Sequence, residues 1–194
     1  MGIALKDIVI LGGPNGAGKT TAAQVLLPKS LRIREFVNAD EIARGLSPFN
    51  PDAVALAAGR LMIQRLRSLV SAEVSFAFET TCSGRLHADW LRRCKIDGWR
   101  ITLLYLWLPS IEMAQARVSR RVTEGGHGIP PDVVARRYLN GIRNMRHIYL
   151  ELADVAAIYD NADEERVLIA ERWEDGFLAV HDATRWQTIE GQSR

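Results

Sequence analysis

Cysteine is scarce in this chain: only Cys82 and Cys94 occur among 194 residues, in no spacing typical of a metal site. The four histidines are scattered as well. We therefore expect two reduced thiols in a cytoplasmic protein, and no metal centre built from protein ligands alone. This composition leaves room for a magnesium ion that arrives with a nucleotide.

Long apolar runs and a strong net charge are also lacking. The longest apolar run, residues 101–108, is far too short to cross a membrane, and residues 1–6 show no secretory signal. The formal charge of +2 is too small to indicate a nucleic-acid or membrane surface by itself. We therefore predict no membrane partner and disfavour nucleic acid as a partner.

A phosphate-binding motif occupies residues 13–20, which read Gly-Pro-Asn-Gly-Ala-Gly-Lys-Thr and match GxxxxGK[ST]. An apolar segment precedes it and helix-forming residues follow it, which is the context that this motif requires. Backbone N–H groups in such a loop surround a polyphosphate, aided by the positive end of the helix. The sequence therefore predicts ATP binding, with GTP as the alternative, by Gly13, Pro14, Asn15, Gly16, Ala17, Gly18, Lys19, Thr20 and Thr21.

Two side chains of this motif carry predictions of their own. Lys19 is expected to reach the β- and γ-phosphates and to act in catalysis, and the Thr20 hydroxyl is expected to bind Mg²⁺. The motif says nothing about the fate of the γ-phosphate.

Strand and helix patterns alternate along the chain, which predicts one α/β domain over residues 1–194 with a parallel sheet. The five expected strands are residues 8–12, 34–38, 75–79, 100–108 and 155–159. Helices are expected at 51–71, 86–93, 111–123 and 131–152, among others. A turn at Glu174-Asp175-Gly176 predicts a C-terminal antiparallel β-hairpin over about 166–181, followed by a short closing helix that contains Trp186.

Two carboxylates follow predicted strands, where ligands bind in sheets of this type. Asp40 is our candidate for the base that activates an acceptor hydroxyl, but a helix N-cap explains it about equally well. Glu79 is expected to hold the acceptor or a magnesium-bound water; alternatively, it fixes its loop through Arg85 or a backbone N–H. The predicted acceptor-binding residues are Asp40, Arg44, Glu79 and Thr81.

Arginines cluster between residues 117 and 137, and we predict that this segment forms a lid over a triphosphate. Arg117, Arg120 and Arg121 share one helix face, a turn rich in glycine and proline follows, and Arg136 and Arg137 lie in the next helix. We expect two or three of the five to be functional, with Arg121 and Arg137 in catalysis and Arg121 and Arg136 at the nucleotide; the others are surface residues. His127 is interpreted as a turn residue, and Asn161 as a base or ribose contact or a simple Asx-turn.

The motifs together resemble those of the zeta-toxin-like family of P-loop kinases, in its short, free-standing branch. They comprise residues 12–21, 38–44, 75–81, 121–130, 136–138 and 159–161. The resemblance implies a nucleotide-kinase-like fold with a mostly parallel five-stranded sheet, a base at Asp40 and lid arginines near Arg121, Arg136 and Arg137. In toxin members the acceptor is UDP-N-acetylglucosamine, and a small antitoxin blocks the nucleotide site. The resemblance therefore implies such an acceptor and such a partner here.

The leading hypothesis is an ATP·Mg²⁺-dependent kinase that phosphorylates a hydroxyl of a small molecule. The alternative is a nucleotide-dependent ATPase switch or binding module without a small-molecule acceptor. The most apolar expected strand, residues 100–108, runs into Pro109 and Ser110 rather than an aspartate of the ATPase type, and this favours the kinase. A kinase of RNA or DNA ends ranks lowest, because the arginines are not interleaved with stacking aromatic residues.

Overall fold

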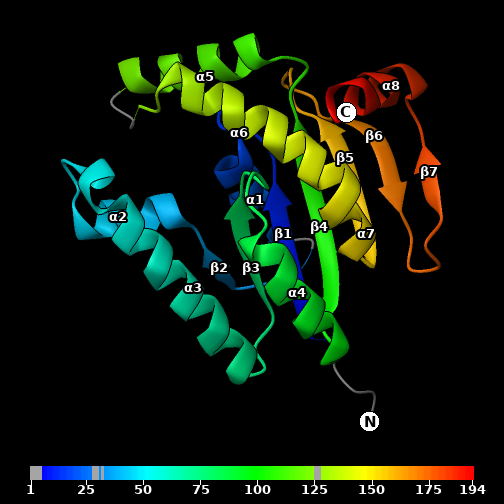
Figure 1. Cartoon of the computed structure of the whole chain (residues 1–194), viewed down its shortest axis with the longest axis horizontal. Helices are drawn as coiled ribbons and strands as arrows, with labels where there is room; N and C mark the ends of the chain where they lie inside the picture. Colours follow the sequence, from blue (N-terminus) through cyan, green and yellow to red (C-terminus); the bar gives the residue numbers. More distant parts are fainter. Residues whose placement is uncertain (1–5, 28–30, 32, 125–127) are drawn as a thin grey trace.

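A seven-stranded sheet forms the centre of the molecule, with strand order β2-β3-β1-β4-β5-β6-β7 (Figure 1). The computed structural model describes residues 6–27, 31, 33–124 and 128–194. Strands β1 to β5 are parallel, whereas β6 and β7 are antiparallel additions at one edge. In chain order the strands are Asp7–Gly12, Glu35–Val37, Phe76–Thr80, Arg100–Trp107, Val155–Asp160, Val167–Arg172 and Leu178–Val180. The predicted parallel sheet of five strands and its C-terminal hairpin are confirmed.

Strand β1 is the middle one of the five parallel strands and is apolar on both faces. Ile8 and Ile10 pack into the larger part of the core, while Val9 and Leu11 pack into a smaller cluster on the opposite face. All four side chains are almost completely buried, as the continuous apolar run predicts for a parallel strand covered by helices. This arrangement fixes the start of the phosphate-binding loop at the carboxyl end of the central strand.

Helices cover both faces of the sheet and its carboxyl-terminal edge. Figure 1 shows α5 and α6 running beside each other above the strand ends, with α2 and α3 on the side of the sheet where β2 lies. The helices are α1 (Lys19–Leu26), α2 (Ala39–Leu46), α3 (Ala55–Ser71), α4 (Leu86–Ile96), α5 (Ile111–Thr123), α6 (Pro131–Asn144), α7 (Leu150–Leu152) and α8 (Ala183–Gln192), with a 3₁₀ turn η2 (Pro51–Val54) and a π-helical segment η3 (Met145–Tyr149).

Two of the expected helices differ from the structure in detail. The helix expected over 51–71 begins with the 3₁₀ turn η2, because Pro51 opens it without a side-chain cap. The helix expected over 131–152 is interrupted by η3, which leaves only three residues for α7. The other elements agree with the sequence predictions to within a few residues at their ends. Among the described residues, no helix is both long and apolar enough to cross a membrane.

The last helix, α8, is bonded to the ends of two central strands. Arg185 forms an ion pair with Asp160 at the end of β5, with Nε 2.7 Å from Oδ2. Gln192 accepts a hydrogen bond from the Trp107 indole N–H at 3.0 Å and donates one to the Pro109 carbonyl at 2.8 Å. The C-terminal helix therefore fixes the turns that leave β4 and β5 at the carboxyl edge of the sheet.

Candidate active site

The motif at residues 13–20 forms a tight loop between β1 and α1. A side chain at Gly13 is excluded, because a Cβ there would lie 2.4 Å from the Leu106 carbonyl oxygen and φ is +145°. Gly18 caps α1 in the left-handed conformation, with φ of +75°, and Lys19 begins the helix. The N-terminus of α1 therefore points its free N–H groups into the loop, as an anion site requires.

Lys19 is folded back into the loop that it belongs to. Its ammonium group donates to the Pro14 carbonyl at 2.8 Å and lies 3.6 Å from Glu79 Oε1. The side chain is only 5% exposed. A buried ammonium group held in this way is ready to pair with phosphate oxygens.

Glu79, at the end of β3, contacts the side of the same loop. Its Oε2 accepts hydrogen bonds from the Thr20 hydroxyl and the Asn38 amide, both at 2.8 Å. Within the described residues its partners are these groups and Lys19 rather than Arg85, so the interpretation that Glu79 locks its own loop through Arg85 is wrong. A hydroxyl and a carboxylate side by side are oxygen donors of the kind that Mg²⁺ prefers, so this pair fits a magnesium site.

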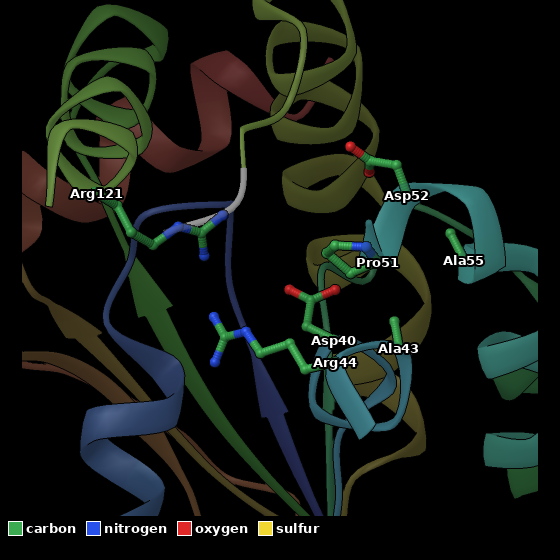
Figure 2. A pocket seen from close by; sticks show the side chains of 7 residues that line it. All are labelled: Asp40, Ala43, Arg44, Pro51, Asp52, Ala55 and Arg121. Carbon is green, nitrogen blue, oxygen red and sulfur yellow. The ribbon is translucent and has the colours of Figure 1, made fainter. Parts of the chain in front are cut away.

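Asp40 lies in the first turn of α2 but does not cap it. The cap is Asn38, whose side-chain oxygen accepts from the Asp40 N–H at 2.8 Å. The N-cap interpretation of Asp40 is therefore wrong, and its carboxylate is left to face the opening. Figure 2 shows Arg121 reaching from α5 toward Asp40 and Arg44 of α2, where all three line a small pocket of about 30 Å³.

Two larger cavities adjoin the loop. We call the first the phosphate cavity: it measures about 300 Å³ and is lined by the loop together with Glu41, Arg44, Arg117 and Arg121. We call the second the acceptor cavity: it measures about 430 Å³ and opens between α2, α3, α4 and α6. The two cavities share four lining residues, Asn15, Lys19, Asp40 and Glu79.

The predicted site residues divide between these cavities. Thr20, Thr21 and Arg121 line the phosphate cavity, and Thr81 and Arg137 line the acceptor cavity. Arg44, predicted at the acceptor, lines the phosphate cavity and pairs with Glu41 at 2.7 Å. Arg136 is exposed and is not among the described residues that line either cavity. The predicted turn residues Gly125, Gly126 and His127 lie outside the described residues.

The side chains of Arg117 and Asn161 donate hydrogen bonds to backbone carbonyls in and beside the loop at residues 13–20. The Arg117 guanidinium donates to the carbonyls of Asn161 and Ala162, at 2.8 and 2.5 Å. The Asn161 amide donates to the Ala17 carbonyl at 2.8 Å. The Asx-turn at this position belongs to Asp160, whose Oδ1 accepts from the Ala162 N–H. These contacts stabilise the loop through its backbone. A nucleotide contact by Asn161 stays a prediction.

Several lining residues have no counterpart among the sequence predictions. The acceptor cavity also contains Arg60, Ser83 and His87. His87 packs on Phe78, with ring centroids 5.2 Å apart, and burial lowers its pKa. These three side chains carry no local motif, whereas Asn38 could have been identified, because asparagine before a helix is a favoured N-cap.

The fold and the loop define a P-loop nucleotide-binding protein of the α/β class. A model of the zeta toxin family matches residues 4–172, so the chain belongs to the zeta toxin family. An uncharacterised protein of Haemophilus influenzae is 30% identical over 126 residues, which cover 65% of this chain and 88% of that protein. The predicted family is therefore confirmed.

Solved structures with the same fold include chains from two protein assemblies. A chain of the AvrRxo1-ORF1:AvrRxo1-ORF2 complex with sulphate ions has a TM-score of 0.79 at 19% identity, over 98% of this chain and 65% of that chain. The complex with ATP gives 0.77 at 18% identity, with the same coverage. A chain of the PezAT toxin–antitoxin system of Streptococcus pneumoniae gives 0.68 at 15% identity, over 99% of this chain and 85% of that chain. The chain thus spans about two thirds of the AvrRxo1-complex chains it matches, and at these identities the likeness establishes the fold.

Proposed function

We propose that this protein is a kinase that transfers the γ-phosphoryl group of ATP to a hydroxyl group of a small molecule. The observation that carries the proposal is that the two cavities share four lining residues, Asn15, Lys19, Asp40 and Glu79. A phosphoryl donor in one cavity and an acceptor in the other would meet at these residues, beside the Lys19 ammonium group and the two carboxylates. Membership of the zeta toxin family supports the same activity.

Lys19 and the N-terminus of α1 would hold the phosphates. The Thr20 hydroxyl and the Glu79 carboxylate would bind Mg²⁺, which supplies positive charge to the triphosphate when it is bound. In catalysis Lys19 would exchange its contact with the Pro14 carbonyl for phosphate oxygens. The Lys19 ammonium group lies 3.6 Å from Glu79 and would remain beside that carboxylate while it contacts the phosphates.

Asp40 is our proposed base. Its carboxylate lines both cavities, so an acceptor hydroxyl in one cavity would be within reach of a phosphoryl group in the other. The hydroxyl would give its proton to Asp40 as its oxygen bonds to phosphorus, and ADP would leave. Arg44 and Arg121, which approach Asp40 in Figure 2, would offset the charge on the transferred group.

The lining of the acceptor cavity suggests the class of acceptor. Arg60 and Arg137 provide positive charge beyond the shared residues Lys19, Asp40 and Glu79, Thr81 and Ser83 provide hydroxyl groups, and apolar side chains of α3 and α4 also line the cavity. We propose an anionic acceptor with a less polar part, and a nucleotide sugar such as UDP-N-acetylglucosamine fits this description. Arg137 would then bind the acceptor rather than the nucleotide.

A protein partner is a further proposal. Among the structures with this fold are a toxin–antitoxin system and the AvrRxo1-ORF1:AvrRxo1-ORF2 complex. We propose that a small antitoxin-like protein covers the phosphate cavity of this chain and blocks its nucleotide site. A cytoplasmic location, where ATP is abundant and thiols stay reduced, is the setting that we propose for it.

The test is ³¹P NMR of ATP·Mg²⁺ turnover with and without a panel of nucleotide sugars. We expect a new phosphomonoester signal that requires both an acceptor and Lys19, and that disappears in Lys19→Ala. Lys95→Ala is the matched control, since Lys95 lies on α4 and pairs with Asp154, away from both cavities. Slow release of inorganic phosphate, unchanged by any acceptor, would instead favour the ATPase switch.

A further inference from the structure

The loop from Thr81 to Gly84, which we call the 81–84 loop, forms one side of the acceptor cavity. Thr81 and Ser83 line the cavity, and their hydroxyl groups lie 2.8 Å apart. Between them Cys82 has φ of +57°, in the left-handed region that side chains other than glycine rarely adopt. Such a conformation persists only where surrounding contacts hold it.

One face of a single helical segment supplies several of these contacts, and the Thr80 hydroxyl adds one by accepting from the Cys82 N–H at 3.1 Å. The Asn144 amide donates to the Cys82 carbonyl at 2.8 Å, and the Tyr149 hydroxyl donates to the Gly84 carbonyl at 2.9 Å. At Gly141 the backbone comes so close that a Cβ would lie 2.4 Å from the Thr81 carbonyl oxygen. Three carbonyls of the 81–84 loop are therefore in contact with one helix, and both donor side chains are buried.

The π-helical segment η3 makes this alignment possible. In an uninterrupted α-helix, eight residues turn through about 800°, so Tyr149 would point about 80° away from Gly141. A π-helical turn takes up one extra residue, which brings Tyr149 back to within about 20° of Gly141. Segments of this kind occur often at functional sites. Here the extra residue lets Tyr149 reach the same loop as Asn144.

The same segment reaches the acceptor cavity directly. Arg137 lies one helical turn before Gly141 and lines the cavity together with Thr81 and Ser83. We propose that Asn144 and Tyr149 are positioning residues: through η3 they fix the 81–84 loop and so set the shape of the acceptor cavity. The proposal rests on the kinase function only in its last step, that the cavity binds the acceptor.

Cys82 offers a direct measure of the 81–84 loop. Its thiol is buried, and burial raises its pKa to about 12, so it reacts with a disulfide reagent only when the loop opens. The chain has one other cysteine, Cys94, and Cys94→Ser leaves Cys82 as the single thiol. The rate at which 5,5′-dithiobis(2-nitrobenzoic acid) labels Cys82 then reports opening of the loop.

We expect labelling to become about tenfold faster in Tyr149→Phe and in Asn144→Ala, because each leaves a loop carbonyl without its donor. Tyr138→Phe is the matched control. Tyr138 is a buried tyrosine of the same helix whose hydroxyl donates to a different backbone carbonyl, that of Leu108, at 2.7 Å. In this control the labelling rate should stay within about twofold of the parent. Unchanged rates in both test variants, or an equal rise in the control, would overturn the proposal.

A second measurement separates positioning from general loosening and from failure of the kinase proposal. Calorimetric titration with ATP·Mg²⁺ should give the same affinity in Tyr149→Phe as in the parent protein. Where the parent phosphorylates a nucleotide sugar, KM for that sugar should rise several-fold in Tyr149→Phe with KM for ATP unchanged. Reduced ATP affinity in Tyr149→Phe would contradict the proposal. Absence of any phosphorylated product from the parent would count against the kinase function alone, since the labelling rates decide the role of the helix.

Discussion

The Thr20 hydroxyl and the Glu79 carboxylate are joined by a hydrogen bond of 2.8 Å, although 59 positions separate them in the sequence. The contact follows from the register of the sheet, because Gly12 at the end of β1 lies opposite Thr80 at the end of β3. A shift of one residue in this register would turn Glu79 to the other face of the sheet. The magnesium site that we propose therefore depends on strand pairing as much as on the motif.

Replacing Glu79 with glutamine should weaken the response to magnesium. Glu79→Gln keeps a side chain that can accept from Thr20 but removes the negative charge that would attract the ion. We expect the Mg²⁺ concentration that half-saturates ATP binding to rise about tenfold, measured by calorimetry at fixed ATP. Glu35→Gln, an exposed carboxylate of β2 paired with Arg65, is the control. Equal magnesium midpoints in the two variants would remove Glu79 from the site.

Replacing Asp40 with asparagine should separate binding from transfer. Asp40→Asn keeps the shape and the helix, since the cap is Asn38, and removes the proton acceptor. We expect ATP affinity close to that of the parent and transfer slower by a factor of roughly 10² to 10⁴ in single-turnover experiments. Asp89→Asn, which alters an exposed carboxylate of α4, should leave transfer unchanged. Near-normal transfer in Asp40→Asn would rule out Asp40 as the base.

The half-buried His87 should make the folded protein less stable in acid. Burial lowers the pKa of His87 below 6.5. Between that lowered pKa and pH 6.5, the unfolded chain therefore binds more protons than the folded chain. Stability contributed by neutral His87 is therefore present above pH 6.5 and is lost as pH falls toward the lowered pKa. In urea unfolding at about pH 8 and about pH 5, His87→Gln should lose less stability than the parent. The exposed His147 gives the control variant His147→Gln, and equal losses in both variants would contradict the prediction.

Two glycines within helices should respond in opposite directions to alanine. Gly141→Ala forces a Cβ to within 2.4 Å of the Thr81 carbonyl oxygen, so the protein should lose stability by about 1–3 kcal/mol. At Gly59 of α3 an added Cβ would meet nothing within 4 Å among the described residues packed around the helix. Gly59→Ala should therefore gain about 0.5–1 kcal/mol from helix propensity. Chemical unfolding measures both changes. A gain in Gly141→Ala would show that the helix and the 81–84 loop are not in tight contact.

The sequence is most informative where a feature is local. The motif at residues 13–20 predicts a loop between a strand and a helix, and the run at residues 101–108 predicts a buried strand, without any knowledge of distant residues; the structure contains that loop and that strand. The alternation of strands and helices predicts the parallel sheet in the same way. Strand ends differ by only one or two residues, which is the usual uncertainty of element boundaries.

The sequence is least informative where the partner is remote. The helix face of Arg117 groups it with the arginines that we predicted to bind phosphate, but its guanidinium contacts the carbonyls of Asn161 and Ala162. Spacing cannot distinguish a phosphate oxygen from a carbonyl oxygen as the target of an arginine. The interruption at η3 has no local signal either, and the residues beside it, Asn144 and Tyr149, bond to the 81–84 loop, which lies more than sixty residues earlier in the chain.

Helix α8 contacts parts of the molecule that the ribosome makes before it. Every described residue that lines the two cavities lies at or before Arg137, and a ribosome makes these residues first. The turn that carries Asn161 to the Ala17 carbonyl is held through Asp160, whose partner Arg185 is made later than all of these residues. A nascent chain thus contains all the chemistry of the site before it contains the helix that braces it. Synthesis of α8 therefore adds a support for the loop at residues 13–20 that was missing while that loop and its lining residues were being made.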